Sequence, residues 1–306
     1  MAHSYVRGHW RREDLSSPMI LAKSCHDLDI LYWMLNSRVK RLSSVGGLRH
    51  FRPENAPEGT PERCLDGCPA ADTCPFYAPA LYLDLEPIYL GLSRALHPGV
   101  RSAGKLMRTV PGIVRAAAKV IPPLRQLTDY EGWPRSVITD RPGDMTSLTE
   151  AVRTGPYGRC VYRADNDVVD HQVVLMEMEN GVSVSFTMHG HSHEEGRTTR
   201  IDGAQATLLG KFSWNKAFIE VRDHRGGGIQ RLDLPNNIEQ GGHGGGDSGL
   251  MAAFVDALAG SGQGTLTDAR SALESHLLAF AAEEARLSAQ VIEMDAFRSE
   301  AEDTQT

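Results

Sequence analysis

The sequence contains no apolar run close to the roughly 20 residues that a membrane-spanning helix needs. Its N-terminus, MAHSYVRGHWRRED, carries basic residues but lacks the apolar core of a signal peptide. Basic residues are fewer than acidic ones, which gives a formal net charge of −7. Binding to nucleic-acid phosphates needs clustered Lys and Arg. We therefore expect a cytoplasmic protein that binds neither membranes nor nucleic acid.

Cysteine is scarce, and its distribution is uneven. The chain of 306 residues has five cysteines, and an odd number without an export signal argues against a framework of disulfides. Cys64, Cys68 and Cys74 crowd into one short segment, with a spacing between the first two that is typical of zinc sites. We predict that this segment binds zinc or an iron–sulfur centre, which also takes cysteine ligands. The fourth ligand stays open between Cys25 and a histidine such as His50, and the alternative is three ordinary thiols.

The segment around these cysteines has an unusual composition. Residues 52–80 are rich in Pro, Gly and Asp and show no period, and a loop of this length is usually functional or needs a local staple. From Ala80 to Arg125 the pattern is weakly helical and is broken at Pro98, Pro111 and Pro122. We predict an insertion over about residues 52–135 that lies on the surface of the domain.

Helices are predicted near both ends of the chain. Ser17 and Pro18 are typical of a helix N-terminus, apolar residues follow at helical spacing, and Asn36 ends the pattern. Two more helices are expected, over Ser248–Ala259 and over about Thr267–Met294. The buried face of the last helix is predicted to consist of Leu273, Leu277, Phe280, Leu287 and Val291.

Strands and turns fill most of the second half. Asn180-Gly181 between two alternating apolar runs is the strongest short-range hairpin signal, and further hairpins are expected around Gly203 and around Gly226–Gly228. Earlier strands are predicted over Ser4–Trp10 and Val39–Phe51. The fold class is α+β, an open, mostly antiparallel sheet of about six strands with helices packed on one face. We expect one domain over residues 1–296 and a disordered tail over 297–306.

The first helix carries a cluster of residues suited to acid–base chemistry. His26 has a side chain whose ordinary pKa is near neutral, as a general acid or base requires. Lys23 lies three residues before it and Asp29 three residues after it, which puts them on neighbouring turns of one broad face. The alternative is that Lys23 and Asp27 form a surface pair, while His26 is a half-buried histidine without a catalytic role.

Several segments in order suggest a family. They are YVRGHW and SPMILAKSCHDLDIL near the N-terminus, then RCVYRADNDVVDHQVV and ENGVSVSFTM, then GGHGGGD, and last the segment from Ser271 to His276. In this order they resemble the C-terminal domain of the Gfo/Idh/MocA family, the oxidoreductases related to glucose–fructose oxidoreductase and inositol dehydrogenase. The resemblance covers nearly the whole chain.

The resemblance implies an NAD- or NADP-dependent oxidoreductase that acts on a hydroxyl of a sugar, an inositol or a related polyol. In that family picture His26 contacts the reacting hydroxyl or relays its proton, Asp29 orients the helix or the histidine, and Lys23 faces the substrate. Many members carry an Asp four residues before this histidine, where this sequence has Ala22.

Three further residues are expected to contact substrate. The segment GGHGGGD is either a flexible connection, in which glycine permits positive φ, or a close backbone approach to a polar substrate. The family context favours the second, with His243 and Asp247 at its rim, and Arg7 of YVRGHW is the third candidate.

The nucleotide-binding half of the family pattern is missing from the sequence. Neither a G-x-G-x-x-G loop in a βαβ unit nor an E-K-P motif occurs, so we expect the substrate domain alone, without a Rossmann domain. The alternative function is a non-catalytic carbohydrate- or metal-binding module, or a pseudoenzyme. A homo-oligomer is expected through the sheet face on which Val182, Val184 and Phe186 lie in line.

Overall fold

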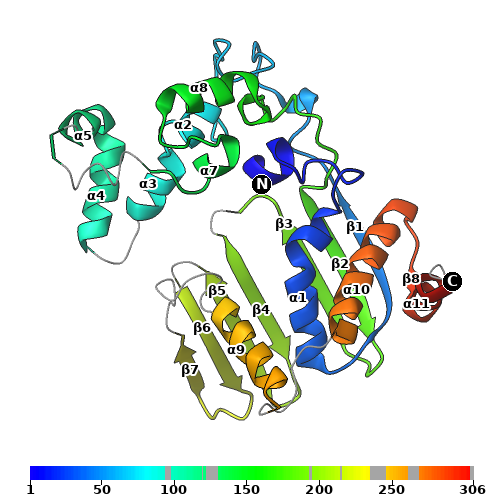
Figure 1. Cartoon of the computed structure of the whole chain (residues 1–306). Helices are drawn as coiled ribbons and strands as arrows, with labels where there is room; N and C mark the ends of the chain where they lie inside the picture. The colour runs from blue at the N-terminus through cyan, green and yellow to red at the C-terminus, as the bar shows by residue number, and fades with distance from the viewer. Residues whose placement is uncertain are drawn as a thin grey trace. The chain divides into compact units, whose positions relative to one another are not determined.

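A computed structural model describes residues 1–93, 98–118, 120–121, 130–192, 195–213, 216–234, 246–260 and 269–303 of the chain. The chain divides into two compact units (Figure 1): unit 1 comprises Met1–His191 and Arg270–Thr306, and unit 2 comprises Ser192–Ala269. Helices and antiparallel strands occur in both units, so the predicted α+β class is confirmed. Within the described residues, no helix has both the length and the apolar composition needed to cross a membrane.

Unit 1 is built on a four-stranded antiparallel sheet. Its strand order is β3 (Ser183–His189), β2 (His171–Met178), β1 (Val39–Gly47) and β8 (Ile292–Glu293). The predicted hairpin between β2 and β3 is confirmed, and Gly181 in its turn has a φ of +85°, a conformation that favours glycine.

Helices α1 (Met19–Leu35) and α10 (Ala269–Ser288) cover one face of this sheet (Figure 1). Helix α1 begins after Pro18 and ends where Asn36 adopts a left-handed conformation with a φ of 44°, as the sequence predicted. The hydrophobic core lies between the helices and the sheet, and its largest fully buried members are Ile20, Leu28, Leu42 and Met294.

The buried face of α10 differs from the prediction. Its core residues are mostly small, namely Leu278, Ala279, Ala281, Ala282 and Ala285. The side chains of Leu273, Phe280, Leu287 and Val291 are instead 45–64% exposed. The physical reason is that alanines let the helix backbone approach the sheet closely, whereas the heptad spacing of the large residues follows the outer face.

The two faces of the unit 1 sheet also differ from the prediction. Val184 and Phe186 pack against the core under the helices, so they do not line an open face. The uncovered face carries other apolar side chains, among them Val45, which is 69% exposed, and Leu175, which is 56% exposed. The alternation of side chains along a strand explains this, because a shift by one residue exchanges the two faces.

The two ends of the chain are helical where other structures were predicted. Residues expected to form a strand from Ser4 form the π-helical segment η1 (Ala2–Arg7). The tail expected from residue 297 continues as helix α11 (Met294–Asp303). Arg298 holds this helix in place, because it pairs with the buried Glu274 at 2.6 Å and donates to the carbonyl of Val39.

The insertion joins irregular chain to short helices. Apart from η2 (Pro53–Asn55) and a bridge residue at Arg63, the residues from 52 to 77 form turns, bends and irregular chain, as predicted. Pro98 and Pro111 begin helices, since proline is tolerated in a first turn. The helical segments of the insertion and its return to the sheet are α2 (Ala78–Tyr82), α3 (Glu86–Ser93), α4 (Pro98–Thr109), α5 (Pro111–Ala118), α7 (Arg135–Ile138), α8 (Met145–Thr154) and η3 (Pro156–Gly158).

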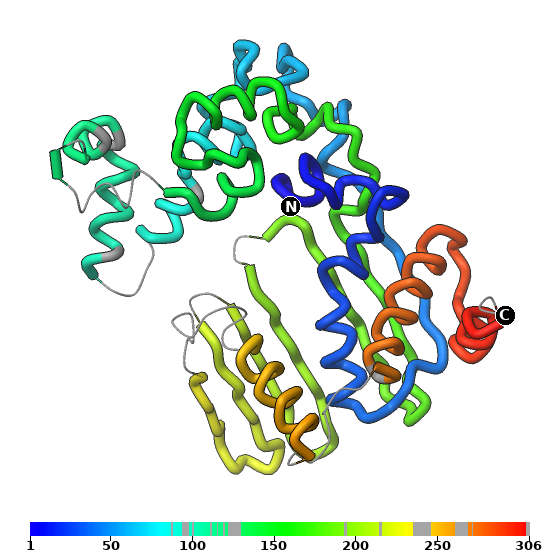
Figure 2. Tube along the Cα trace, in the orientation of Figure 1, coloured from blue at the N-terminus to red at the C-terminus, as the bar shows by residue number. Residues whose placement is uncertain are grey.

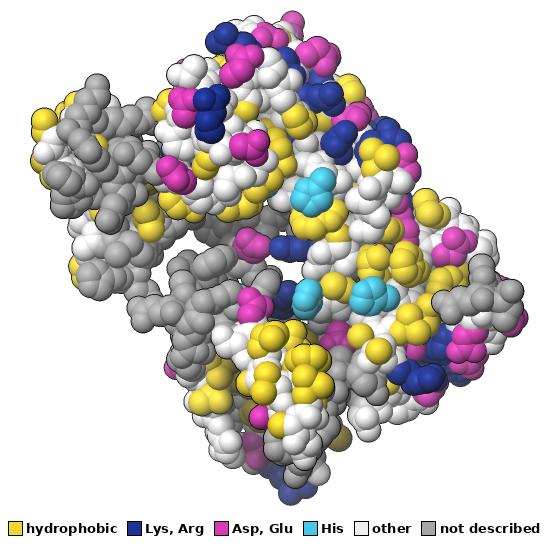
Figure 3. Space-filling view, viewed as in Figure 1, with side chains coloured by type: hydrophobic (Ala, Val, Ile, Leu, Met, Phe, Trp, Pro, Cys, Tyr) yellow, Lys and Arg dark blue, Asp and Glu magenta, His cyan; other side chains and the backbone are white. Residues whose placement is uncertain are grey.

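Unit 2 has its own four-stranded antiparallel sheet. The two predicted hairpins are confirmed by the order β4 (Gly196–Asp202), β5 (Ala206–Ser213), β6 (Lys216–Asp223) and β7 (Ile229–Asp233). The strands of the described residues therefore form two sheets of four, and the expectation of one sheet with about six is corrected. Helix α9 (Gly246–Leu258) follows, and hydrophobic side chains gather over its exposed surface (Figure 3).

Candidate functional site

Helix α1 brings the predicted catalytic residues together on unit 1. Lys23 and His26 are both exposed and lie on one face of the helix, three residues apart, whereas Asp29 is half-buried toward its flank. The buried residues Ser24 and Leu28 hold the opposite face against the core. The sheet thus fixes α1, and α1 presents an ammonium and an imidazole to solvent.

The imidazole of His26 contacts the thiol of the preceding residue. Its Nδ1 lies 3.3 Å from the thiol sulfur of Cys25, the preceding residue on the helix. This contact occupies one ring nitrogen and leaves Nε2 to meet a molecule in solvent. No Asp precedes the histidine by one turn, since that position is the half-buried Ala22.

Large apolar side chains continue the exposed face of α1. Ile30 and Trp33 follow His26 at helical spacing, and the side chain of Trp33 is 61% exposed. The neighbouring helix α10 adds the exposed Leu273, Phe280 and Leu287. Both helices pack on the same core cluster, so these residues form a surface of unit 1 that we call the α1–α10 surface. Exposed apolar area of this kind marks binding sites on soluble proteins.

The three predicted substrate contacts belong to different segments of the chain. Arg7 is only 1% exposed and lines a small cavity in unit 1. Asp247 is exposed in the first turn of α9, which belongs to unit 2. His243 lies outside the described residues.

Arg7 belongs to a second polar region. It is formed by the irregular segment from residue 52 to residue 77, which carries Cys64, Cys68 and Cys74 and which we call the cysteine loop. A small cavity of about 10 Å³ is lined by Cys64, Cys68 and Cys74, by Arg7, and by a fourth cysteine, Cys160. Sequence reasoning missed Cys160, although it stands in the quoted segment RCVYRADNDVVDHQVV. In the described residues no group of three or more His, Cys, Asp or Glu side chains is already positioned to hold a metal ion. All five cysteines are free thiols.

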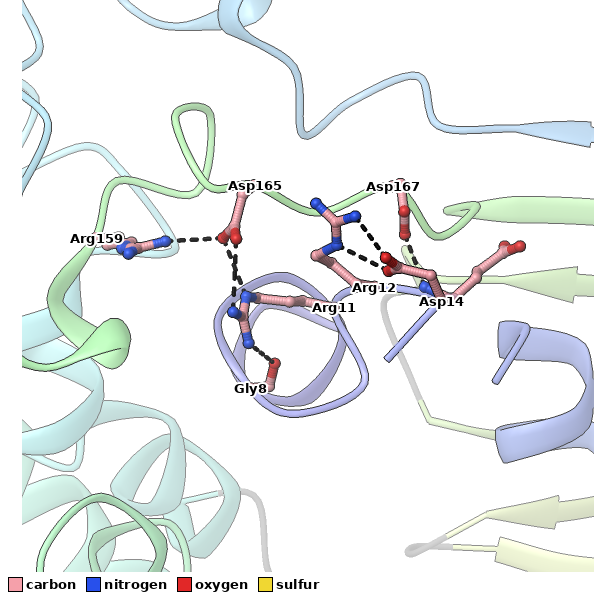
Figure 4. Close-up of polar contacts among 8 residues, drawn as sticks. Gly8, Arg11, Arg12, Asp14, Arg159, Asp165 and Asp167 are labelled. Atoms are coloured by element: carbon pink, nitrogen blue, oxygen red, sulfur yellow. Dashed lines mark hydrogen bonds and ion pairs between the residues drawn. The ribbon is translucent and has the colours of Figure 1, made fainter. Parts of the chain in front are cut away.

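The segment that carries Cys160 is clamped to the N-terminal residues (Figure 4). Arg11 and Arg159 both bind the carboxylate of Asp165, at 3.0 and 2.8 Å. The hydrogen bond from Arg11 holds the pKa of Asp165 below its usual range. Asp167 accepts from the backbone amide of Glu13 at 2.9 Å. Figure 2 shows the N-terminal segment running beside this part of the chain.

The carboxylate of Asp170, 2% exposed, holds several loops together at the end of the same segment. It accepts hydrogen bonds from the backbone amides of Arg49 and His50, at 2.9 and 2.6 Å, and from His171 at 2.9 Å. Burial acts to raise the pKa of Asp170, but these hydrogen bonds outweigh it and hold the pKa below its usual range. His191 lies 3.9 Å away, and burial lowers its pKa. The arrangement is a structural junction.

Comparisons with known proteins add little to this geometry. No family model and no curated protein matches the chain. Among solved structures the chain is similar to an NAD-binding protein from Listeria innocua, with 12% sequence identity and a TM-score of 0.40. The match covers 94% of this chain and 50% of the other, so the chain spans about half the length of that protein.

Proposed function

We propose that unit 1 is the substrate-binding half of an NAD- or NADP-dependent oxidoreductase that acts on a hydroxyl of a sugar, an inositol or a related polyol. The observation that carries the proposal is the exposed pair of Lys23 and His26 on α1, a helix fixed by the core. The resemblance to the Gfo/Idh/MocA family assigns this helix to the active site, and the substrate class comes from that resemblance.

The described residues do not themselves fit a dinucleotide. Both sheets are antiparallel, whereas a dinucleotide fold needs a parallel βαβ unit with a glycine-rich turn. The proposal therefore places the cofactor on a separate nucleotide-binding segment. The α1–α10 surface supports this arrangement, because it surrounds Lys23 and His26 with exposed apolar side chains that another domain would cover.

The chain's own residues have two tasks in this proposal. The Nε2 atom of His26 takes the proton of a substrate hydroxyl, or returns it in the reverse direction, because an imidazole nitrogen can act as a general base or, when protonated, as a general acid. The ammonium of Lys23 donates a hydrogen bond to an oxygen of the same substrate, which fixes its position along the helix. Asp29 lies on the flank of α1 and positions the helix rather than touching substrate.

Calorimetric titration of the purified chain with myo-inositol, glucose and sorbitol tests the substrate part. We expect saturable binding to at least one of them, weakened about tenfold or more by His26→Ala and by Lys23→Ala. His224→Ala is the matched control, because His224 is an exposed histidine in unit 2, at the turn after β6. Binding that is unchanged in His26→Ala, or absent in the folded wild-type chain, would count against the proposal.

A non-catalytic carbohydrate-binding module would pass the calorimetric test, so a second measurement separates the two functions. Formation of NAD(P)H from a bound polyol is followed by absorbance, with the chain assayed together with a nucleotide-binding domain. The oxidoreductase proposal predicts turnover that His26→Ala lowers by about 100-fold or more. Polyol binding without any hydride transfer would favour the binding module.

The proposal also includes self-association through the uncovered face of the unit 1 sheet. Val45 and Leu175 expose large apolar areas there, and a second copy would cover them. Light scattering during gel filtration should give the mass of a dimer for the wild type and of a monomer for Leu175→Arg. A monomeric wild type would remove this part of the proposal without affecting the α1 site.

A further inference from the structure

Four of the five cysteines surround one small cavity in unit 1. Cys64, Cys68, Cys74 and Cys160 all line it, and the other lining residues include prolines, aromatic side chains and Arg7. Cys64 and Cys160 are buried, and Cys68 and Cys74 are half-buried. No Asp or Glu is among the described residues that line the cavity. Four thiols and no carboxylate are the donor set that soft metal ions select.

A short backbone pairing brings the distant Cys160 to the other three. Arg63 and Arg159 form an antiparallel bridge, in which Cys64 donates to the carbonyl of Gly158 at 2.9 Å and Cys160 to that of Glu62 at 2.8 Å. Side chains alternate along each strand, so the residues that follow Arg63 and Arg159 point to the face opposite to those two arginines. Cys64 and Cys160 therefore lie on the same face as diagonal neighbours.

The pairing depends on Gly158, two residues before Cys160. Any Cβ at position 158 would collide with the backbone carbonyl oxygen of Val152 in α8. The side chain of Arg63 reinforces the contact, because it donates to the carbonyls of Val152 and Gly155. The chain therefore approaches α8 closely at this point, and the approach sets the position of Cys160.

The turns after Cys64 bring in the remaining two thiols. Cys68 accepts a backbone hydrogen bond from Ala71, and Cys74 donates its amide to Ala70 at 2.8 Å. These are local turns in otherwise irregular chain. A loop of this length without strands or long helices needs another source of order.

The cavity wall also contains a buried positive charge, the guanidinium of Arg7. Arg7 is 1% exposed, and its guanidinium is a cation with several hydrogen-bond donors. Its hydrogen bonds go to neutral groups, namely the carbonyls of Arg159 and Phe76 at 2.7 and 2.8 Å and the thiol of Cys64 at 3.5 Å. Its Nη1 atom is buried and has no hydrogen-bond partner. A buried cation of this kind is costly unless negative charge lies close by.

We propose that Cys64, Cys68, Cys74 and Cys160 bind a single zinc ion beside Arg7, and that this site staples the cysteine loop to the segment after α8. The cavity of about 10 Å³ has room for one water-sized particle, and four cysteine ligands complete the tetrahedral coordination that a structural zinc ion takes.

The charge balance of this step is consistent with the cavity. Zn²⁺ replaces the four thiol protons, which pass to solvent, and the four new sulfur–zinc bonds give a complex with a net charge of −2. Arg7 offsets part of that charge, and its unpartnered Nη1 gains a thiolate acceptor. Since the thiols are not already gathered at ligand positions in this structure, zinc must draw the turns inward when it binds.

The test is elemental analysis of the full chain purified from a zinc-supplemented medium without chelators. We expect about one zinc per chain in the wild type and less than about a fifth of that in Cys160→Ser. Cys25→Ser is the matched control, since Cys25 lies on α1 beside His26 and away from the cavity. It should retain the wild-type zinc content.

A second measurement covers the case in which Cys160→Ser does not fold. Cobalt added to the folded, zinc-depleted wild type should give intense thiolate-to-cobalt absorption, and the Cys25→Ser variant should give the same spectrum. The proposal is overturned if the folded wild type binds neither zinc nor cobalt, if its four thiols are found as disulfides, or if it carries stoichiometric iron.

Discussion

The two polar regions of unit 1 differ in the exposure of their charged and polar groups. On α1, Lys23 and His26 are exposed on a regular helix whose other face is fixed by a large core. In the cysteine cavity, Arg7 is 1% exposed and lies among turns of irregular chain. The first region has exposed side chains on a helix that the core supports, whereas the second has a buried cation and little regular structure.

This difference indicates different roles for the two regions. An exposed pair on a fixed helix costs little stability and is available to a substrate. A buried arginine with an unpartnered nitrogen costs stability unless an anion is close. Substitutions in the cavity should therefore act on folding and metal content, and substitutions on α1 should act on binding.

The largest effect is expected from Gly158→Ala, because its Cβ collides with the backbone of α8. We predict a loss of about 3 kcal/mol in the free energy of unfolding, together with loss of bound zinc. Urea denaturation and elemental analysis measure the two effects. Gly91→Ala is the control, since a Cβ there meets open space. Equal stability of the two variants would show that the close approach at Gly158 does not matter.

The next largest effect is expected from Arg7→Met, which keeps the volume of the side chain but removes the buried cation. The metal complex loses its neighbouring positive charge and the two carbonyls lose their donors, so we predict a loss of about 2 kcal/mol and weaker zinc binding. Zinc affinity is measured by competition with a chelator. Arg12→Met removes an exposed pair with Asp14 (Figure 4) and should leave zinc binding unchanged. Stronger zinc binding in Arg7→Met would contradict the charge argument.

Glu13 is an intermediate case, since it is half-buried beside α10. Burial and the nearby Glu283 raise the pKa of Glu13 from an ordinary value of 4.5 to about 7. The folded chain therefore holds this proton at pH values where the unfolded chain has lost it. The resulting stability is complete below about pH 4.5 and is lost as the pH rises through about 7.

Glu13→Gln should remove this pH dependence. We predict that the variant is more stable than the wild type by about 1 kcal/mol at pH 8, after allowance for solvent screening of the half-exposed side chain. Thermal unfolding across the pH range measures it, with Glu54→Gln as an exposed control. The assignment would be refuted if the free energy of unfolding rose between pH 5 and pH 8 by the same amount in the wild type, in Glu13→Gln and in Glu54→Gln.

The smallest effect on stability is expected from His26→Ala, although its effect on polyol binding should be large. The side chain is exposed on a helix, and alanine is a better helix former, so the free energy of unfolding should change by less than about 0.5 kcal/mol. Urea denaturation checks this. A large loss of stability would mean that His26 is a structural histidine, the alternative that its spacing also allows.

Local signals explain how much of the fold was predictable. The hairpin at Asn180-Gly181 and the helix that ends at Asn36 depend on short segments whose backbone preferences need no distant partner. The face of α10 could not be predicted in the same way. Its buried alanines are recognisable only once the helix lies close to the sheet. The regular spacing of large side chains such as Phe280 therefore predicted the wrong buried face.

The two candidate sites also differ in how far local sequence signals predict them. Lys23 and His26 fall on one helix face, so their spacing alone placed them together. Cys160 joins the cysteine loop through the bridge between Arg63 and Arg159, a contact between distant parts of the chain. Likewise, no local pattern showed that Arg7 is buried beside those thiols and therefore lies apart from the helix face.

The most direct test of the division between the two regions is an NMR titration of the wild-type chain with myo-inositol, glucose and sorbitol. We expect that at least one polyol shifts the imidazole signals of His26 in a saturable way, while the guanidinium signals of Arg7 stay unchanged. Saturable shifts at Arg7 with none at His26 would contradict it, because they would place the substrate at the cysteine cavity and not on α1.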